Sequence, residues 1–307
     1  MHAPAGRTHL TRRGRRLRTL VVGGLAVLLV VVAGAVSYRA LRGPVVVREL
    51  CSATAGGTTY TLTPEQAGNA ATIAAVAVRR GLPARAATIA IATAVQESKL
   101  RNIRYGDRDS VGLFQQRPSQ GWGTVEQILD PVYATNAFYD RLVAVHGYET
   151  MEITEASHRV QRSAFPRAVA DHEPEGRAFA FALTGHSPRG LTCRLHQVRA
   201  VAAQPASESG FVPRAAAVRD ALRTDFWDVA AAPVAGGTAV RVSTRGDERT
   251  AWAVASWAVA RARGLDVVSV TTDGVQWRRD EPDAGWADVE NDVAPSGVVT
   301  IQVASAT

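Results

Sequence analysis

An uncharged run near the start of the chain, residues 19–38, is the strongest constraint on its arrangement. A helix of about 20 apolar residues spans the hydrocarbon core of a membrane. Residues 1–18 contain six arginines and no acidic residue, and positive charge of this kind stays on the cytoplasmic side. We therefore expect a cytoplasmic basic tail (1–18), a transmembrane anchor (19–38) and a remainder outside the cytoplasm. The alternative is a secretion signal cleaved near Ala33-Gly34-Ala35, which would leave the same remainder secreted.

The basic charge of the chain is concentrated in that tail. The formal net charge is +7, and removing the six arginines of residues 1–18 leaves +1 for the rest. A nucleic-acid-binding domain carries a basic patch of its own. The sequence therefore predicts no nucleic-acid partner.

The two cysteines, Cys51 and Cys193, both follow the apolar run. Thiols outside the cytoplasm are usually oxidised, so we expect a disulfide that clamps the intervening segment. Two cysteines without a histidine at ligand spacing fall short of the four ligands of a structural zinc site. The sequence thus predicts a disulfide, and neither a metal nor a cofactor.

The pattern of apolar residues predicts an α+β fold made of two parts after the anchor. The first is a mainly α domain, residues 51–195, and the second is a small α/β module, residues 214–307, after a linker at 196–213 that is rich in Pro, Ser, Gly and Ala. In the first part, Thr63 and Gln66 form a capping box for a helix that stops at Gly81. Further helices are expected at 84–98, 124–129, 131–145, 154–163 and 166–182. In the module we expect helices at 214–223 and 248–263, strands at 238–244 and 297–305, and a hairpin turning at Asp273-Gly274.

Glu97 stands at the end of the apolar helix 84–98, just before a polar loop. A carboxyl group at such a boundary loses solvation, which raises its pKa and favours the protonated form. A protonated Glu beside a groove is what general-acid cleavage of a glycosidic bond requires. The alternative is an exposed glutamate in the last turn of a helix, with no role in chemistry.

Two short motifs favour Glu97 as a general acid over Glu97 as an exposed residue without a chemical role. Residues 96–98 read Gln-Glu-Ser, and after a loop rich in Gly and Asp residues 112–115 read Gly-Leu-Phe-Gln. This combination resembles the lysozyme-like lytic transglycosylases, which cut the glycan strands of peptidoglycan. The stretch 130–142 looks like the next helix of that family. The block as a whole is also similar to exported or membrane-anchored actinobacterial lysozyme-like proteins, and the resemblance covers about residues 63–185.

The resemblance implies that Glu97 is the general acid and base. It would protonate the oxygen between N-acetylmuramic acid and N-acetylglucosamine, then take the proton of the muramyl 6-hydroxyl, leaving a 1,6-anhydro end. A hydrolysing lysozyme more often uses a second carboxylate, for which Asp107 and Asp109 are the candidates. Both are also ordinary turn-forming residues.

Other polar and aromatic residues of this segment are candidates for substrate binding. Ser98 either orients Glu97 or caps the helix. Gln115 bonds to a sugar N-acetyl group or to Glu97, or alternatively to the loop backbone. The remaining candidates are Gln116, Gln120 and Trp122, of which Trp122 is alternatively a core residue. Many relatives carry a late Tyr near the catalytic Glu, and residues 156–173 contain none. Gln161, Arg162 and Ser163 are the candidates for covering that side.

Two other classes of function remain open at this point. One is a non-catalytic peptidoglycan-binding protein that keeps the lysozyme-like fold. The other is a scaffold that meets a cell-envelope protein partner through residues 214–307, a module to which we assign no chemistry. Four tryptophans of this module are expected to pack in its core rather than to bind sugar: Trp252, Trp257, Trp277 and Trp286.

Overall fold

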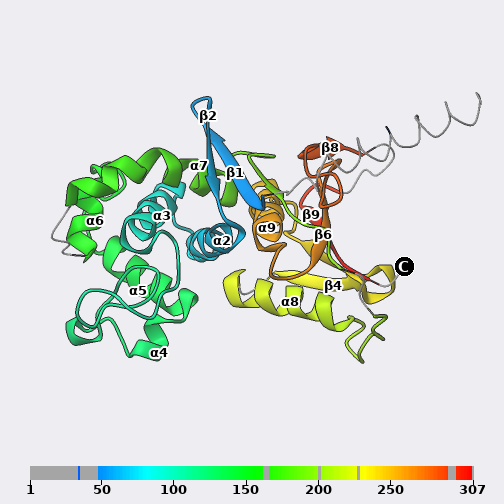
Figure 1. Ribbon diagram of the computed structural model, residues 1–307, viewed down its shortest axis with the longest axis horizontal. Coiled ribbons are helices and arrows are strands. Elements are labelled where there is room, and N and C mark those ends of the chain that lie inside the picture. The colour runs from blue at the N-terminus through cyan, green and yellow to red at the C-terminus, as the bar shows by residue number, and fades with distance from the viewer. Residues whose placement is uncertain are drawn as a thin grey trace, which may run out of the picture. The chain divides into compact units, whose positions relative to one another are not determined.

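The computed structural model (Figure 1) describes residues 48–161, 166–199, 202–226, 229–289 and 295–305, together with Gly34. Arg48–Thr307 form one compact unit, and Met1–Val47 form another. The tail and anchor predicted at residues 1–18 and 19–38 lie outside the described residues, apart from Gly34. None of the helices in the described part of the chain combines the length and the apolar character that crossing a membrane needs.

The unit Arg48–Thr307 is an α+β fold built around one helix, α2 (Pro64–Arg79). Residues 70–77 of α2 are buried without interruption, as expected for a helix that is apolar on every side. Helices from both halves of the chain pack on it. The other α-helices are α3 (Ala84–Ser98), α4 (Val125–Ile128), α5 (Pro131–Val143), α6 (Ile153–Gln161), α7 (Glu173–Leu183), α8 (Pro213–Phe226) and α9 (Glu248–Arg261), and the 3₁₀ helices are η1 (Pro118–Gln120), η2 (Pro166–His172) and η3 (Ala235–Gly237).

The predicted helix boundaries are confirmed where local capping sets them. At the start of α2 the Thr63 amide donates to Gln66 Oε1 over 2.8 Å, and the Gln66 amide donates to Thr63 Oγ1 over 3.4 Å. Helix α3 has the predicted bounds. The expected helix 166–182 is wrong as one element, because it divides into η2 and α7. Pro174 lies in the first turn of α7, and a proline inside a longer helix would remove a backbone hydrogen bond and clash with the preceding turn.

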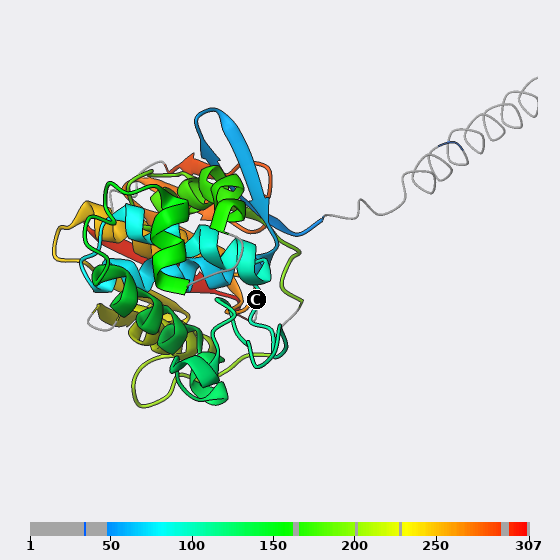
Figure 2. The same ribbon diagram turned by 90° about the vertical axis from the view of Figure 1, so that its left-hand side faces the viewer.

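A small sheet that the sequence did not predict joins the two ends of the mainly α part. Its strands are β1 (Leu50–Ala55), β2 (Thr58–Leu62) and β3 (Leu191–Arg194), in the order β2-β1-β3 and all antiparallel. The turn between β1 and β2 projects beyond the neighbouring helices in both views (Figure 1, Figure 2). Cys51 and Cys193 are directly opposite each other in β1 and β3, and they form the predicted disulfide with both residues fully buried.

The second half of the unit carries a six-stranded antiparallel sheet in the order β4-β5-β9-β6-β7-β8. Asp273 and Gly274 both have positive φ, of 49° and 70°, which confirms the predicted type I′ hairpin between β6 and β7. Strand β9 pairs with both β5 and β6, so it lies at the centre of the sheet. The strands are β4 (Ala230–Val234), β5 (Ala239–Ser243), β6 (Val267–Thr272), β7 (Val275–Arg278), β8 (Trp286–Asp288) and β9 (Val298–Val303).

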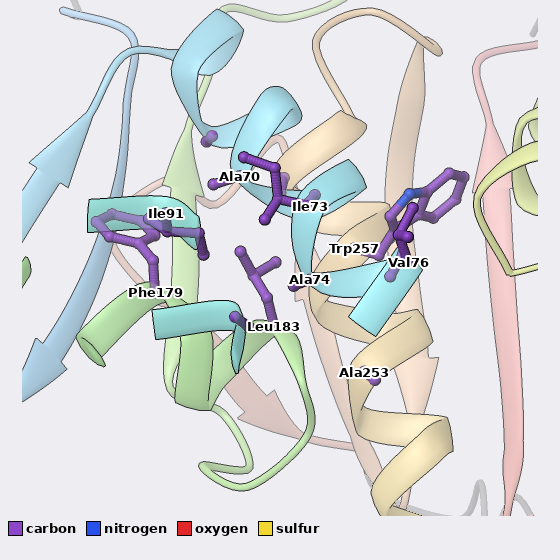
Figure 3. Close-up of a cluster of buried hydrophobic side chains, with 14 of the residues drawn as sticks. Ala70, Ile73, Ala74, Val76, Ile91, Phe179, Leu183, Ala253 and Trp257 are labelled. Carbon is purple, nitrogen blue, oxygen red and sulfur yellow. The ribbon is translucent and has the colours of Figure 1, made fainter. Parts of the chain in front are cut away.

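Helix α9 lies between this sheet and α2, so one hydrophobic core runs through both halves. Figure 3 shows Ile73 and Val76 of α2 among side chains from α3, α7 and α9, including Trp257 of α9. Three of the four tryptophans are at least 96% buried, at 4%, 0% and 1% exposure for Trp252, Trp257 and Trp277, and Trp286 is half-buried against the core. The prediction that these rings pack internally is confirmed.

Asp225, at the end of α8, is a polar centre inside that core. Asp225 is only 2% exposed. Asp225 Oδ2 accepts hydrogen bonds from Trp257 Nε1 at 2.7 Å and from Thr72 Oγ1 at 3.0 Å, and the Arg261 guanidinium lies 3.6 Å away. One carboxylate therefore connects α2, α8 and α9.

Replacement of Asp225 by Ala should destabilise the whole unit. The substitution leaves the Trp257 N–H and the Thr72 hydroxyl without their acceptor and the Arg261 guanidinium without its counter-charge, which we expect to cost on the order of 3 kcal/mol. Urea denaturation measures this difference. Asp220→Ala, an exposed position on the same helix, is the control and should change the free energy of unfolding by less than about 0.5 kcal/mol. Equal effects of the two substitutions would contradict the role of Asp225.

Removal of the disulfide by Cys51→Ala with Cys193→Ala should lower the melting temperature. The bridge closes a loop with a sequence separation of 142 residues, for which the chain-entropy relation gives about 4–5 kcal/mol. A loss of this size corresponds to roughly 10 °C in a unit of this length. Thermal unfolding followed by circular dichroism measures it, and two free thiols in the native protein by Ellman's reagent would refute the prediction.

Candidate functional site

Helix α3 carries Glu97 to the point where the helix leaves the core. Residues 84–95 of α3 are buried apart from Arg85, whereas Gln96 and Glu97 are only partly buried. One turn before Glu97, the Thr93 hydroxyl lies 2.8 Å from the Ser157 hydroxyl of α6. Residues four apart share one face of a helix, so the Glu97 side chain lies on the side of α3 that faces α6.

The carboxyl group of Glu97 has an unusual electrostatic environment. Burial raises the pKa of this carboxyl group from the ordinary 4.5 to about 7. Among the described residues, no hydrogen-bond or ion-pair partner compensates it. A carboxyl group of this kind is protonated in a large fraction of molecules near neutral pH, and it can both give and take a proton there.

The backbone just after Glu97 is held in a conformation that side chains rarely permit. Lys99 and Leu100 both have φ of 56°, a left-handed geometry that costs on the order of 1 kcal/mol for each residue that is not glycine. Two side chains of α2 hold this turn. Gln66 Nε2 donates to the Lys99 carbonyl over 2.8 Å, and Asn69 Nδ2 donates to the Leu100 carbonyl over 2.7 Å. Helix α2 thereby fixes where α3 ends and where Glu97 stands.

Ser98 joins the two halves of the predicted motif. Its hydroxyl donates to the Leu113 carbonyl over 2.7 Å and accepts from the Arg101 amide at 3.2 Å. The residue is 7% exposed, and no hydrogen bond to Glu97 is formed. The hydrogen bonds of Ser98 therefore secure the end of helix α3 and tie it to the loop, and none of them orients Glu97.

The segment 112–116 packs as a tight loop on this helix end. The Gly112 amide donates to the Ile103 carbonyl over 2.7 Å, and Val111 forms a β-bridge with Gln116. On the opposite side, Gln161 Nε2 of α6 donates to the Phe114 carbonyl over 2.6 Å. The loop is therefore hydrogen-bonded to α3, which carries Glu97, and to α6, which that side of α3 faces. Arg162 and Ser163, the other residues considered for this side, lie outside the described residues.

The four remaining candidates for substrate contact are distributed between surface and core. Gln115 is half-exposed, with its Nε2 donating to the Gly112 carbonyl at 3.2 Å, and Gln120 is exposed at the end of η1. Gln116 is 1% exposed, and its Nε2 donates to the Ala134 carbonyl over 3.1 Å. Trp122 is 3% exposed under the Arg141 guanidinium, which lies 3.3 Å from the ring centroid.

The structure therefore corrects the assignment of Gln116 and Trp122 as groove-lining residues. Both side chains face the interior, because the loop folds back on the start of α5, and neither presents a free surface to a substrate. Gln115 and Gln120 keep exposed surface and remain available for contact.

The two candidates for a second carboxylate have different surroundings. Asp109 accepts from Arg117 Nε at 2.7 Å and from the Ser119 amide at 2.8 Å. The hydrogen bond from Arg117, followed by that from Ser119, holds the Asp109 pKa well below its usual range. Its role is to fold the loop back on itself. The Asp107 side chain is 91% exposed, with Arg108 Nε 3.9 Å away.

Tyr105, between the two motif halves, was not selected from the sequence. It is 75% exposed, and its backbone carbonyl accepts from Gln115 Nε2 at 3.4 Å. The arginines on both sides of Tyr105 in "RNIRYGDR" are the sequence feature that could have pointed to it as a binding residue. Only the fold shows that the ring points to solvent.

In the part of the chain that the structure describes, no three His, Cys, Asp or Glu side chains gather as metal ligands would.

Neither a protein-family model nor a curated protein matches this chain.

Replacement of Glu97 by Gln should stabilise the protein at high pH and leave it unchanged at low pH. The folded-state pKa of about 7 exceeds the ordinary 4.5, so the folded protein binds this proton more tightly than the unfolded chain does. Relative to the Gln variant, the wild type then loses stability as pH rises from 4.5 to 7, by on the order of 2–3 kcal/mol in total. Urea denaturation at pH 4 and pH 8 measures the difference.

Glu208→Gln, at an exposed position in the 202–212 segment, is the matched control and should show no such pH dependence. A difference between Glu97→Gln and wild type that stays constant from pH 4 to pH 8 would refute the raised pKa.

Proposed function

We propose that this protein cleaves the bond between N-acetylmuramic acid and N-acetylglucosamine in peptidoglycan, with Glu97 as general acid and base. The observation that carries the proposal is the partly buried Glu97 carboxyl group, with a pKa of about 7 and no charged partner among the described residues. The resemblance of residues 96–98 and 112–115 to the lytic transglycosylase motifs supports it. The contact from Ser98 to Leu113 brings these two motifs together.

The reaction uses one carboxyl group twice. Protonated Glu97 donates its proton to the bridging oxygen, the glycosidic bond breaks, and the muramyl C1 develops positive charge. The resulting Glu97 carboxylate then removes the proton from the muramyl 6-hydroxyl, whose oxygen bonds to C1 and closes a 1,6-anhydro ring. The carboxyl group is restored, and no water is consumed.

The surroundings of the two aspartates favour this route over hydrolysis. A hydrolase with two carboxylates holds the second one across the bond. Asp109 is committed to Arg117 and Ser119, and the Asp107 side chain extends into solvent. Glu97 acting alone fits a transglycosylase, which needs no second carboxylate.

The proposed location follows from the sequence. Residues 19–38 anchor the protein in the cell membrane, and the unit Arg48–Thr307 lies outside the cytoplasm, where peptidoglycan is found. A buried disulfide between Cys51 and Cys193 is consistent with an oxidising compartment.

Glu97→Gln should abolish release of anhydro-muropeptides from purified peptidoglycan. Losing a general acid costs about 10²- to 10⁴-fold in rate, while Gln keeps the shape of the side chain. Full-length protein in mild detergent is incubated with sacculi at pH 6, and soluble products are identified by mass spectrometry. Glu208→Gln is the control and should retain full activity.

Products with reducing ends in place of anhydro ends would mean that the enzyme is a hydrolase. If wild-type protein sediments with sacculi yet releases no product, the catalytic proposal fails and the protein is a peptidoglycan-binding module.

A further inference from the structure

The loop between the two motif halves presents an aromatic ring flanked by positive charge. We call residues 101–108 the arginine loop. Tyr105 at its centre is 75% exposed, the largest exposed fraction of any large hydrophobic side chain in the described part of the chain. Arg101, Arg104 and Arg108 around it are exposed as well. An exposed aromatic ring with cations beside it can pack on a ligand while the cations pair with the ligand's negative charge.

The backbone of the arginine loop is fixed, so its side chains are presented in a set arrangement. The Ile103 carbonyl accepts the Gly112 amide at 2.7 Å, and the Tyr105 carbonyl accepts Gln115 Nε2 at 3.4 Å. Gly106 packs so closely that a Cβ there would lie 1.8 Å from Gln115 Oε1. Because the backbone lies against Gln115, the Tyr105 ring projects away from the body of the protein.

The charge of the arginine loop is not neutralised by its surroundings. Three arginines and one acid, Asp107, leave +2 across residues 101–108. Among the described residues, Arg101 and Arg104 form no ion pair, and Arg108 reaches only Asp107, at 3.9 Å. The nearby Asp109 is occupied by Arg117. The whole chain after residue 18 carries only +1, so this is a local concentration of charge.

We infer that the arginine loop binds an anionic substituent of the glycan strand, with Tyr105 packed on a sugar ring and the arginines paired to the negative charge. This inference rests on the proposed function, since it concerns the substrate of the same site. Arginine binds both carboxylates and phosphates through paired N–H donors. The anionic group is therefore either a carboxylate of the lactyl or stem-peptide portion, or a phosphate of a polymer attached to the glycan.

Binding to purified sacculi tests this inference separately from catalysis. Full-length protein in mild detergent is sedimented with sacculi at low salt and at 0.5 M NaCl. Two preparations distinguish the sources: untreated sacculi, and sacculi stripped of phosphodiester-linked polymers by acid. Arg101→Glu with Arg104→Glu and Arg108→Glu reverses the charge of the loop. The matched control reverses three exposed arginines of the C-terminal half, Arg223, Arg241 and Arg245.

The arginine-loop variant should bind untreated sacculi about tenfold more weakly than wild type and lose most of its dependence on salt. The control variant should bind as wild type does. Tyr105→Ala should also weaken binding, with Phe181→Ala, a 38% exposed ring elsewhere, as its control. Wild-type binding that falls on acid-stripped sacculi identifies phosphate, and salt-sensitive binding that persists on acid-stripped sacculi identifies carboxylate. Melting curves establish that each variant is folded.

Unchanged binding by the arginine-loop variant overturns the inference, as does equal weakening by the variant and its charge-matched control. Wild type that releases no product, together with a specific loss of binding in the variant, refutes the proposed catalysis and leaves the binding surface standing. In an active enzyme the variant should raise KM with little change in kcat, because the inference gives these side chains a role in binding the strand and leaves proton transfer to Glu97.

Discussion

The burial of helix α2 on all of its sides is the constraint on which the rest of the described structure depends. Its buried stretch, residues 70–77, is mostly alanine with Ile73 and Val76, and small side chains let neighbouring helices approach closely. Helices α3, α5 and α7 pack on it from the first half of the chain, and α8 and α9 from the second. The position of α2 therefore decides how the mainly α part and the sheet-bearing part meet.

The same helix places the proposed proton donor. Gln66 and Asn69 of α2 hold the left-handed turn at Lys99 and Leu100, and this turn stops α3 directly after Glu97 and Ser98. A partly buried carboxyl group without a partner is unfavourable for stability when it is ionised. The surrounding packing compensates that cost, as is common for strained or desolvated groups at functional sites.

Local sequence signals predicted those parts of the fold that depend on neighbouring residues. The capping box at Thr63 and Gln66, the apolar run of α3 and the Asp273-Gly274 turn each act within a few residues. The sheet of β1, β2 and β3 was missed because β1 pairs with a strand about 140 residues later. The interior placement of Gln116 and Trp122, and the outward placement of Tyr105, follow from how the loop folds onto α5 and α6. Spacing along the chain does not reveal this.

The position of the disulfide has a mechanical consequence. The described part of the unit starts at Arg48, and Cys51 follows three residues later in β1, cross-linked to Cys193 in β3. Tension applied along the chain from the N-terminal side reaches this covalent bond before it can peel β1 away from its neighbours. The load then passes into β3, whose carbonyls at Leu191 and Cys193 accept hydrogen bonds from Trp286 and Trp277 of the large sheet. A protein tethered at its N-terminal end would transmit a pull into its core without unravelling at the point of attachment.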